Sequence, residues 1–351
     1  MRRLLLLIFF LIVVAVGAAG FVVYRRIFEP YKGYPAREQI VDLRQGSGAS
    51  EIGRRLVETG VIRDVLTFNV ALWRSGEARH LQAGEYRFDR PMTPSEVIDK
   101  IRRGDVYEQR VTFPEGLSIS EMAMLVESRE LGTAASFIDA AKDASLVSAL
   151  DPDARDLEGY LFPETYSLRP GTPASRLVRM MVDRFEKEFP PDLRQAAAER
   201  GLTVHQAVVL ASLVEKETPR DEERPLVAAV YMNRLRKRMP MQCDPTVIYA
   251  LRKAGKYDGN LKREDLAFDS PYNTYRYPGL PPGAIAAPGR RSLEAAARPA
   301  AVDHLYFVSR NDGSHVFAST LEEHNRNVQK YQVQYFREKR LSSSASPASP
   351  R

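Results

Sequence analysis

The longest apolar run of the chain stands near its start. The letters "LLLLIFFLIVVAVGAAGFVVY", residues 4–24, contain no charge and have two arginines on either side. A helix needs about 20 apolar residues to cross a bilayer, whereas the apolar part of a cleaved signal peptide has about 7 to 15. The run therefore predicts an uncleaved transmembrane anchor over residues 1–28. A cleaved signal peptide is the alternative, because "AVGAAG" offers small residues.

The charges around this run do not fix its orientation, since the arginines on its two sides nearly balance. Only a very short segment precedes the run, and a long body follows it. We therefore expect a single-pass protein with a cytoplasmic N-terminus and an exported body.

Beyond the anchor, an extended stretch, a turn and a capped amphipathic helix follow one another three times. The first copy is "QIVDLRQGSGASEIGRRLVETG". In the second copy Thr93 is the predicted N-cap with Glu96 three residues later, and Ser118 and Glu121 have these roles in the third. The first two copies fall within a small β/α module that we expect over residues 36–110, and the third copy opens the next region. A module of this kind is either a spacer or a polymer-binding unit.

The pattern changes near residue 151. The stretch "DLEGYLFPETYSLRPGT" is rich in aromatics, prolines and acids, which is typical of a cleft wall built from loops. A mainly helical stretch follows to about residue 238, and "HLYFVSR" and "HVFAS" predict a hairpin around "NDGS". The final letters, residues 341–351, are of low complexity and predict a disordered tail. The expected fold class is α+β: a transmembrane helix, the small module, and a mixed helical and β domain over residues 111–340.

The charge balance favours an anionic surface as a partner. Lys and Arg number 51 and Asp and Glu 45, which gives a formal net charge of +6. Much of the positive charge stands beside the apolar run and in "RLRKRM". This suits a membrane or a wall polymer, and no basic stripe interleaved with aromatics indicates nucleic acid.

The motifs that would indicate metal or nucleotide chemistry are missing from the sequence. The single cysteine, Cys243, excludes an intrachain disulfide and a cysteine-cluster zinc site. The sequence has no H-E-x-x-H, no Walker loop, no G-x-G-x-x-G and no G-x-S-x-G. We therefore expect no metal and no organic cofactor.

One apolar helix ends in two glutamates. In "GLTVHQAVVLASLVEKETP", Thr203 and Gln206 form a capping box, and Pro219 ends the helix. Glu215 and Glu217 then lie in the last turn, where the helix dipole makes a carboxylate unfavourable by about 0.3–1 kcal/mol. That field and partial burial both favour the protonated form, which a general acid requires.

From the helical pattern alone, a structural role for these two glutamates is as well supported as a catalytic one. Either carboxylate could form an ion pair with Lys216, Arg220 or Arg224. The helical pattern alone does not choose between Glu215 and Glu217 as the acid.

Several longer motifs carry a resemblance. "LEGYLFPETY", "ASLVEKET", "AAVYMNRL", "QCDPTVIYAL", "SPYNTYRYPGLPPGAIAAPG" and "TLEEHNRNV" follow in this order. Together they resemble the endolytic murein transglycosylase (YceG-like) family, from the anchor to about residue 331. Members of that family are anchored in the inner membrane and face the periplasm. They carry a LysM-like segment, which residues 40–106 resemble.

The resemblance implies an activity. The family cleaves the β-1,4 bond between N-acetylmuramic acid and N-acetylglucosamine within nascent glycan strands, leaves a 1,6-anhydro end and so limits strand length. Implied partners are the peptidoglycan strands themselves and the peptidoglycan synthases (penicillin-binding proteins) at the same membrane. A muramidase-type hydrolase and a non-catalytic peptidoglycan-binding scaffold are the alternatives. The intact "VEKET" motif argues against the scaffold.

The resemblance also assigns the acid, because the first glutamate of "VEKET" is the family's catalytic residue. This is Glu215, and Glu217 would adjust the charge of the site or hold its geometry. Glu158 would line the sugar cleft, and Asp244 and Thr246 either cap a helix or contact the ligand. The full set of expected supporting or substrate-binding residues is Glu217, Glu158, Gln242, Asp244, Thr246, Tyr272, Asn273, Thr274 and Tyr275, the last four forming a binding wall.

Overall fold

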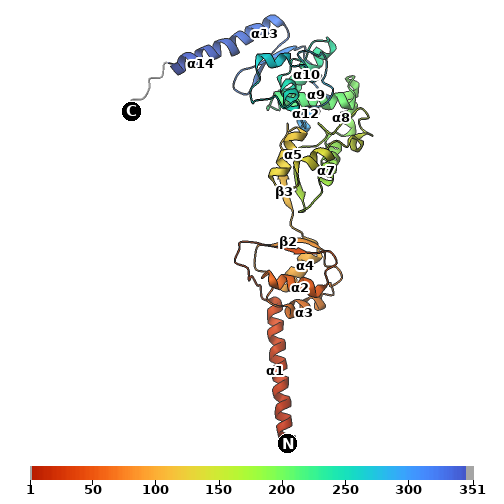
Figure 1. The fold of residues 1–351 in the computed structure, drawn as a ribbon, viewed down its shortest axis with the longest axis vertical. Coiled ribbons are helices and arrows are strands. Elements are labelled where there is room, and N and C mark those ends of the chain that lie inside the picture. Colours follow the sequence, from red (N-terminus) through yellow and green to blue (C-terminus); the bar gives the residue numbers. More distant parts are fainter. Residues whose placement is uncertain (1, 345–351) are drawn as a thin grey trace. The chain divides into compact units, whose positions relative to one another are not determined.

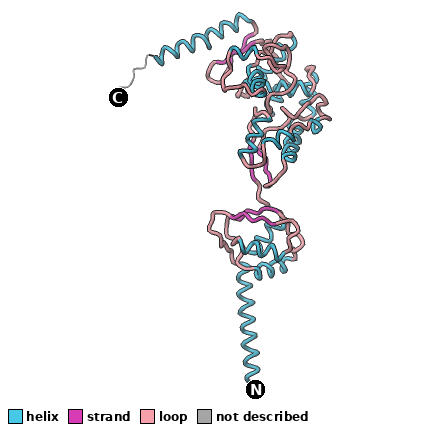
Figure 2. The backbone as a smooth tube through the Cα atoms, in the orientation of Figure 1, coloured by secondary structure: helices cyan, strands magenta, loops and turns pink. Residues whose placement is uncertain are grey.

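The computed structural model describes residues 2–344, and the chain divides into two compact units. The first comprises Met1–Arg110 with Ser167–Pro170, and the second Val111–Tyr166 with Gly171–Arg351. In the described residues helices predominate, and the strands form three separate two-stranded sheets (Figures 1 and 2). The expected α+β class is confirmed in this sense.

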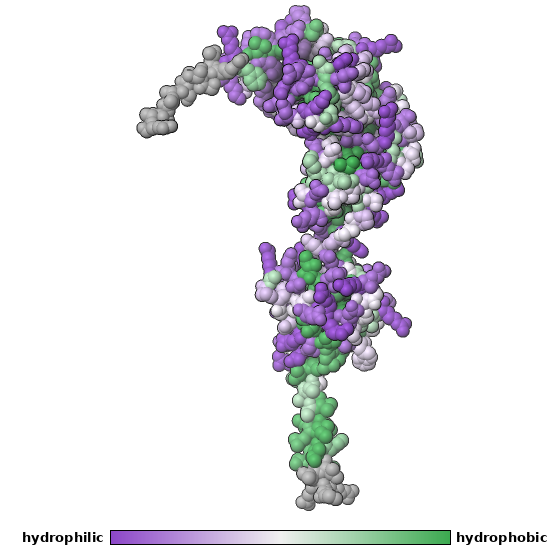
Figure 3. Space-filling model, in the orientation of Figure 1, coloured by the Kyte–Doolittle hydropathy of each residue, from purple (hydrophilic) through white to green (hydrophobic). Residues whose placement is uncertain are grey.

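The first unit begins with the long helix α1, Arg2–Phe28. Its apolar span, Leu6–Phe28, has a hydropathy of 3.0 and is long enough to cross a membrane. Figure 3 shows this span as a mostly hydrophobic surface, green with a paler stretch along the helix. At its end Ile27 is 3% exposed and packs in the core of the following module, with Val23 against it. The apolar helix and the module therefore belong to one packed body.

The module that follows has three helices and one antiparallel sheet. Strand β1, Gln39–Leu43, pairs with β2, Gly84–Phe88, so that Gln39 lies opposite Phe88. Helices α2 (Ala49–Glu58), α3 (Val65–Ser75) and α4 (Pro94–Arg102) cover the core. The predicted capping box of Thr93 and Glu96 is confirmed at the start of α4. The core side chains include Val41, Leu56, Phe68, Tyr86, Phe88 and Ile101.

One glycine of this module is needed for close packing. Gly60 has a φ of +73°, and a Cβ there would lie 2.9 Å from the backbone of Gly33. The Gly33 amide donates to the Gly60 carbonyl at 2.8 Å. Any other residue would disrupt this contact and the left-handed turn together.

The second unit is built mainly from helices around α9, Val204–Glu217. Strands β3 (Gln109–Thr112) and β4 (Thr165–Leu168) pair in a two-stranded sheet. The capping box of Ser118 and Glu121 is confirmed at α5. The remaining elements up to the hairpin are α5 (Ile119–Ser128), α6 (Ala134–Ala140), η1 (Ala144–Val147), α7 (Ala174–Glu188), α8 (Pro191–Glu199), α10 (Arg224–Arg236), α11 (Asp244–Lys253), η2 (Arg263–Ala267) and α12 (Arg290–Ala297).

The predicted hairpin is confirmed near the end of the chain. Strands β5, Tyr306–Ser309, and β6, His315–Ala318, pair antiparallel around the expected turn. Helix α13 (Leu321–Val328), a π-helical segment η3 (Gln329–Gln334) and α14 (Tyr335–Ser344) follow. Helix α14 includes residues 341–344, the first four residues of the segment expected as a disordered tail. Residues 345–351 lie outside the described part of the chain.

Candidate active site

The helix that carries the two glutamates is the central helix of the second unit. Helix α9 begins with the predicted capping box of Thr203 and Gln206, and every residue from Ala207 to Val214 is buried. It packs against α8, α10, α11 and α12. Thr218 follows in an extended conformation with φ −140°, as expected before a proline. The carboxylates of Glu215 and Glu217, in the C-terminal turn of α9, therefore lie among the packed helices.

The Glu215 side chain is only 5% exposed and is held from two directions. Its two carboxylate oxygens accept hydrogen bonds from Arg224 Nη1 and Nη2, both at 3.3 Å. The Gly289 amide at the start of α12 donates to Oε2 at 2.9 Å. The structural ion pair considered from the sequence is thus present, and its cation is Arg224.

A second carboxylate, Glu115, shares the same guanidinium. Its Oε2 lies 3.6 Å from Arg224 Nη2, and its side chain is 46% exposed. Asp221 approaches Arg224 Nε at 3.4 Å from the other side. Glu115 was not among the residues predicted from the sequence, and Arg224 was only one of three possible cations, because Glu115 and Arg224 lie far apart along the chain. The only signal was the turn sequence "FPEGLS" immediately before a capped helix.

Two glycines allow this close arrangement. A Cβ on Gly289 would lie 1.9 Å from Oε1 of Glu115, so a side chain there would displace that carboxylate. Gly116 has a φ of +78°, and its Cβ position lies 3.7 Å from Cγ of Glu215. The Gly116 carbonyl also accepts from Lys216 Nζ at 2.9 Å. The Glu115–Gly116 turn therefore lies directly on the end of α9.

Opposing influences act on the acidity of Glu215. Burial raises the pKa of Glu215, and the Glu115 charge adds to this effect. The Gly289 amide and the Arg224 guanidinium lower it, but burial prevails and the net pKa is raised. Burial thus disfavours the ionised Glu215 carboxylate, while Arg224 and the Gly289 amide donate hydrogen bonds to it. Burial therefore favours the protonated carboxyl group, and the two donors stabilise the ionised one.

Glu217 faces a different set of side chains. Its Oε1 accepts the Tyr231 hydroxyl at 2.7 Å, and burial raises its pKa. The buried Cys243 thiol also contacts it. The two glutamates of the motif therefore occupy separate environments, with the strong ion pair only at Glu215.

Glu158 is buried at 7% exposure beside a large cavity. It accepts hydrogen bonds from the Ile119 amide at 3.0 Å and the Tyr249 hydroxyl at 3.1 Å. Burial nevertheless raises its pKa to about 8. The next residue, Gly159, packs so closely on α9 that a Cβ would lie 2.8 Å from Val208. Close packing of Gly159 on α9, the helix that carries Glu215, therefore positions Glu158.

The cavity has a volume of about 870 Å³, within the range of about 300–1,000 Å³ that is typical of ligand sites. Its wall combines apolar side chains with charged ones. Lys216, the neighbour of Glu215, lines it, so the cavity adjoins the C-terminal end of α9. The other charged lining residues are Glu121, Lys142, Asp156, Glu158, Arg252 and Lys253.

The expected wall of four consecutive side chains is only partly exposed. Asn273 and Thr274 are buried, at 0% and 1% exposure. Asn273 Nδ2 donates to the carbonyls of Leu266 and Phe268, which fixes the loop internally. Both side chains therefore help to hold the loop in place, and their support of a ligand site stays a prediction.

Thr246 is buried as well and joins this loop to α11. Its hydroxyl donates to the Cys243 carbonyl at 2.7 Å and lies 2.9 Å from the Thr274 hydroxyl. The Thr246 hydroxyl is therefore engaged inside the protein, and a ligand contact at this residue stays a prediction.

The remaining predicted residues lie nearer the surface. Tyr275 donates its hydroxyl to Asp244 at 2.5 Å, and Asp244 is the first residue of α11. Tyr272 packs its ring 4.9 Å from that of Tyr249 and lines a smaller cavity that also touches Glu158. Gln242 is exposed and has a φ of +53°. Tyr272 is thus the member of the expected wall that lies beside Glu158.

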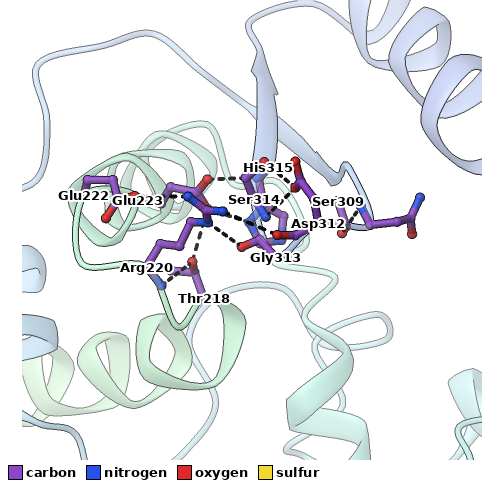
Figure 4. Close-up of polar contacts among 10 residues, drawn as sticks. Thr218, Arg220, Glu222, Glu223, Ser309, Asp312, Gly313, Ser314 and His315 are labelled. Carbon is purple, nitrogen blue, oxygen red and sulfur yellow. Dashed lines mark hydrogen bonds and ion pairs between the residues drawn. The ribbon is translucent and has the colours of Figure 1, made fainter.

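A second polar cluster holds the loop between α9 and α10 (Figure 4). Glu223 accepts the His315 amide at 2.8 Å and lies 2.7 Å from its Nδ1. Burial alone would raise the pKa of Glu223, but the hydrogen bonds from His315 lower it below its ordinary value. Arg220 donates to the Gly313 carbonyl at 3.0 Å. The hairpin turn therefore fixes the start of α10, whose first residue is Arg224.

Within residues 2–344, no group of three or more His, Cys, Asp or Glu side chains is placed to hold a metal ion. What the described site offers is acid–base chemistry. Glu215 can exchange a proton, and Arg224 and the Gly289 amide can stabilise its ionised form.

Comparisons with known proteins found a matching family model and similar sequences. A family model described as the YceG-like family matches residues 41–330. A Bacillus subtilis (strain 168) protein named endolytic murein transglycosylase is 32% identical over 332 residues, covering 90% of this chain and 91% of that protein. A protein of the same name from Streptococcus pneumoniae serotype 2 (strain D39 / NCTC 7466) is 30% identical, covering 89% of this chain and 62% of that protein.

A solved structure is also similar. The crystal structure of a yceG-like protein from Listeria monocytogenes superposes with a TM-score of 0.58 at 30% identity. The match covers 83% of this chain and 98% of that one. The long match to the family model and the two relatives of similar sequence lead to one conclusion: this chain belongs to the YceG-like family.

Proposed function

We propose that this protein is a lytic transglycosylase that cuts peptidoglycan glycan strands internally. It cleaves the β-1,4 bond between N-acetylmuramic acid and N-acetylglucosamine and leaves a 1,6-anhydro end, which stops strand elongation. Membership of a family whose relatives are named endolytic murein transglycosylases supports this reaction class. The single observation that carries it is the buried Glu215 carboxyl group at the end of α9, which meets Arg224 and the Gly289 amide and whose pKa is raised by burial.

Glu215 is the catalytic residue in this proposal, and one carboxyl group performs both proton transfers. Its proton passes to the glycosidic oxygen as the bond from that oxygen to the anomeric carbon breaks. The resulting carboxylate then takes the proton of the muramoyl C6 hydroxyl, whose oxygen bonds to the anomeric carbon. Glu215 ends protonated, and no water is consumed. Acid–base help of this kind contributes about 10²- to 10⁴-fold in rate.

The neighbours of Glu215 suit this cycle. Burial favours the acid before the first transfer, whereas Arg224 and the Gly289 amide stabilise the carboxylate that remains after it. Ordinary glycosidases use two carboxyl groups, one of them for water or as nucleophile. An attacking hydroxyl supplied by the substrate removes that need. Glu217, bound to Tyr231, then has a supporting role.

The glycan would occupy the cavity beside α9. Tyr249 and Tyr272 present ring surfaces near Glu158, and Lys216, Arg252 and Lys253 bring positive charge to the same region. Aromatic faces suit sugar rings, and the basic groups suit the carboxylates of muramoyl residues and their peptides. Glu158, Gln242, Asp244, Tyr272 and Tyr275 remain our candidates for substrate contacts or their direct support.

The rest of the chain would place this activity at the membrane. We propose that α1 is an uncleaved anchor of the inner membrane, with the N-terminus cytoplasmic and the second unit periplasmic. The module of residues 36–110 is the proposed LysM-like unit, residues 111–340 the catalytic region, and the peptidoglycan synthases the proposed partners at the same membrane.

Digestion of purified, uncrosslinked glycan strands by the full-length protein tests the function. Mass spectrometry of the products should show anhydromuramoyl ends and internal fragments, and Glu215→Gln should abolish both. Glu217→Gln is the matched control on the same helical turn and should keep measurable activity. Reducing ends would support the muramidase alternative, and binding without cleavage would support the scaffold. Activity lost in Glu217→Gln but kept in Glu215→Gln would reverse the assignment of the acid.

A further inference from the structure

The only tryptophan of the chain lies fully on the surface. Trp73 is 84% exposed on α3, and Leu66, seven residues earlier on the same helix, is 61% exposed. Seven residues are two helical turns, so both side chains share one face. The opposite face of α3 is buried through Phe68 and Leu72. Helix α3 thus presents large apolar side chains both to the core and away from it.

Helix α3 is fixed to the end of the apolar helix α1. Arg26 Nη1 lies 3.3 Å from Asp64, which also caps α3 by accepting from the Thr67 amide. At the other end of α3 the Arg74 guanidinium lies 5.3 Å from the centre of the Phe28 ring. With Ile27 buried in the module core, these contacts hold α3 beside the last turn of α1.

The surface of a bilayer crossed by α1 would pass close to this junction. The uncharged run ends at residue 24, and Arg25 and Arg26 follow immediately. Figure 1 shows α3 at the end of the module that adjoins α1, whereas β2 lies at the module's opposite end. The outward face of α3 therefore stands at the depth of the lipid headgroups.

The chemistry of that face suits this depth. Tryptophan is enriched where a membrane meets water, because its ring is apolar and its N–H can still be hydrated. Arg63 stands three residues before Leu66 and pairs with Glu29 at 3.7 Å, and Arg74 directly follows Trp73. Positive charge of this kind beside an apolar face suits the phosphates of lipid headgroups. Interfacial helices bury such a face by about 5–10 Å at the boundary between headgroups and acyl chains.

We propose that α3 is a membrane-surface helix, with Trp73 and Leu66 inserted into the headgroup region of the bilayer that α1 crosses. This inference rests on the proposed anchor. The occupant is the lipid surface because the exposed face continues from the apolar span of a helix packed in the same body. The module is then held against the bilayer by two attachments, and it does not swing freely about α1.

The fluorescence of Trp73 tests this directly, since no other tryptophan contributes. The full-length protein is placed in bilayers of phosphatidylethanolamine and phosphatidylglycerol, with or without bromine on the acyl chains. Retention in the bilayer after an alkaline carbonate wash is recorded first. We expect emission at shorter wavelength than for the unfolded chain, strong quenching by brominated lipid, and a clear loss of quenching by aqueous acrylamide.

A matched control moves the reporter within the module. In the double variant Trp73→Phe, Arg87→Trp the single tryptophan stands on the exposed side of β2, where acrylamide should quench it and brominated lipid should not. A retained protein whose Trp73 behaves like this control overturns the inference and leaves the anchor intact. Trp73 shielded from both quenchers would mean that a protein surface covers α3, which also overturns it. Release by the carbonate wash would overturn the anchor itself, and the inference with it.

Discussion

The carboxylate of Glu215 and the guanidinium of Arg224 meet through two contacts of 3.3 Å, and each side chain is only 5% exposed. A buried pair of this kind sets the charge of the site, because either group alone would be poorly solvated. The half-exposed Glu115 approaches the same guanidinium from the surface. The acidity of Glu215 should therefore respond in opposite directions to changes at these two neighbours.

Removing the cation should raise the pKa of Glu215 and destabilise the fold. In Arg224→Gln the influence that lowers this pKa is lost, so the alkaline limb of the activity profile should move to higher pH. Leaving a buried carboxylate unpaired costs about 3–5 kcal/mol, measured by urea unfolding. Arg224→Lys is the control. It keeps the positive charge but loses the pair of hydrogen bonds to the two Glu215 oxygens, so the alkaline limb of its activity profile should move less. An unchanged limb in Arg224→Gln would show that the pair does not control the acid.

Glu115→Gln should move the same limb the other way. The Glu115 charge raises the pKa of Glu215, so its removal lets Glu215 ionise at lower pH and activity should fall off earlier. Because Glu115 is 46% exposed, the shift should be modest and the change in unfolding free energy within about 0.5 kcal/mol. A limb that moves upward, or a large loss of stability, would contradict this role.

Gly289→Ala should imitate the loss of Glu115. The backbone of Gly289 has a φ of −75°, which alanine also adopts, but the new Cβ would lie 1.9 Å from Oε1 of Glu115. The exposed Glu115 side chain can swing away, so stability should fall by less than about 1 kcal/mol. The limb should shift in the same direction as in Glu115→Gln. The double variant Glu115→Gln, Gly289→Ala should show no further shift, whereas additive shifts would mean that the methyl group acts on Glu215 directly.

Glu158 should make the protein less stable as the pH rises. Its pKa is raised from 4.5 to about 8, so the folded protein holds the proton more tightly than the unfolded chain. The resulting stability is complete below pH 4.5 and is lost as the pH rises towards 8. Each unit of difference between the folded and unfolded pKa of Glu158 corresponds to about 1.4 kcal/mol, so the total loss in the free energy of unfolding is a few kcal/mol.

Urea unfolding at several pH values measures this effect. Glu158→Gln should remove most of the decline between pH 5 and 8 that the parent protein shows. Glu164→Gln is the matched control from the same segment, where the carboxylate is half-exposed beside Arg184, and it should keep the decline. Parallel pH curves for the parent and Glu158→Gln would disprove the prediction.

Local patterns predicted the local structure well. The capping boxes at Thr93, Ser118 and Thr203 and the hairpin of residues 306–318 all formed as expected, because each depends on residues a few positions apart. The end of α9 before Pro219 was also predicted correctly for this reason. Helix α3 was missed, because its apolar residues face both the core and the outside and so blur the amphipathic pattern.

The contacts that define the site could not be predicted in this way. Glu115, Arg224 and Gly289 meet only after three distant segments pack together, and no periodicity connects them. The burial of Asn273 and Thr274 could not be predicted for a related reason: polar side chains in a loop can point to solvent or satisfy buried backbone groups. The resemblance pointed to Glu215, and the structure supplied the neighbours that would tune it.

The central claim is that Glu215 directs a hydroxyl of the substrate, and not water, to the anomeric carbon. Digesting glycan strands in water labelled with heavy oxygen tests this most directly, with Glu215→Gln beside the parent protein. The account predicts anhydromuramoyl ends without label from the parent and no new ends from the variant. Labelled reducing ends from the parent, or unlabelled anhydro ends from Glu215→Gln at the parent's rate, would contradict it.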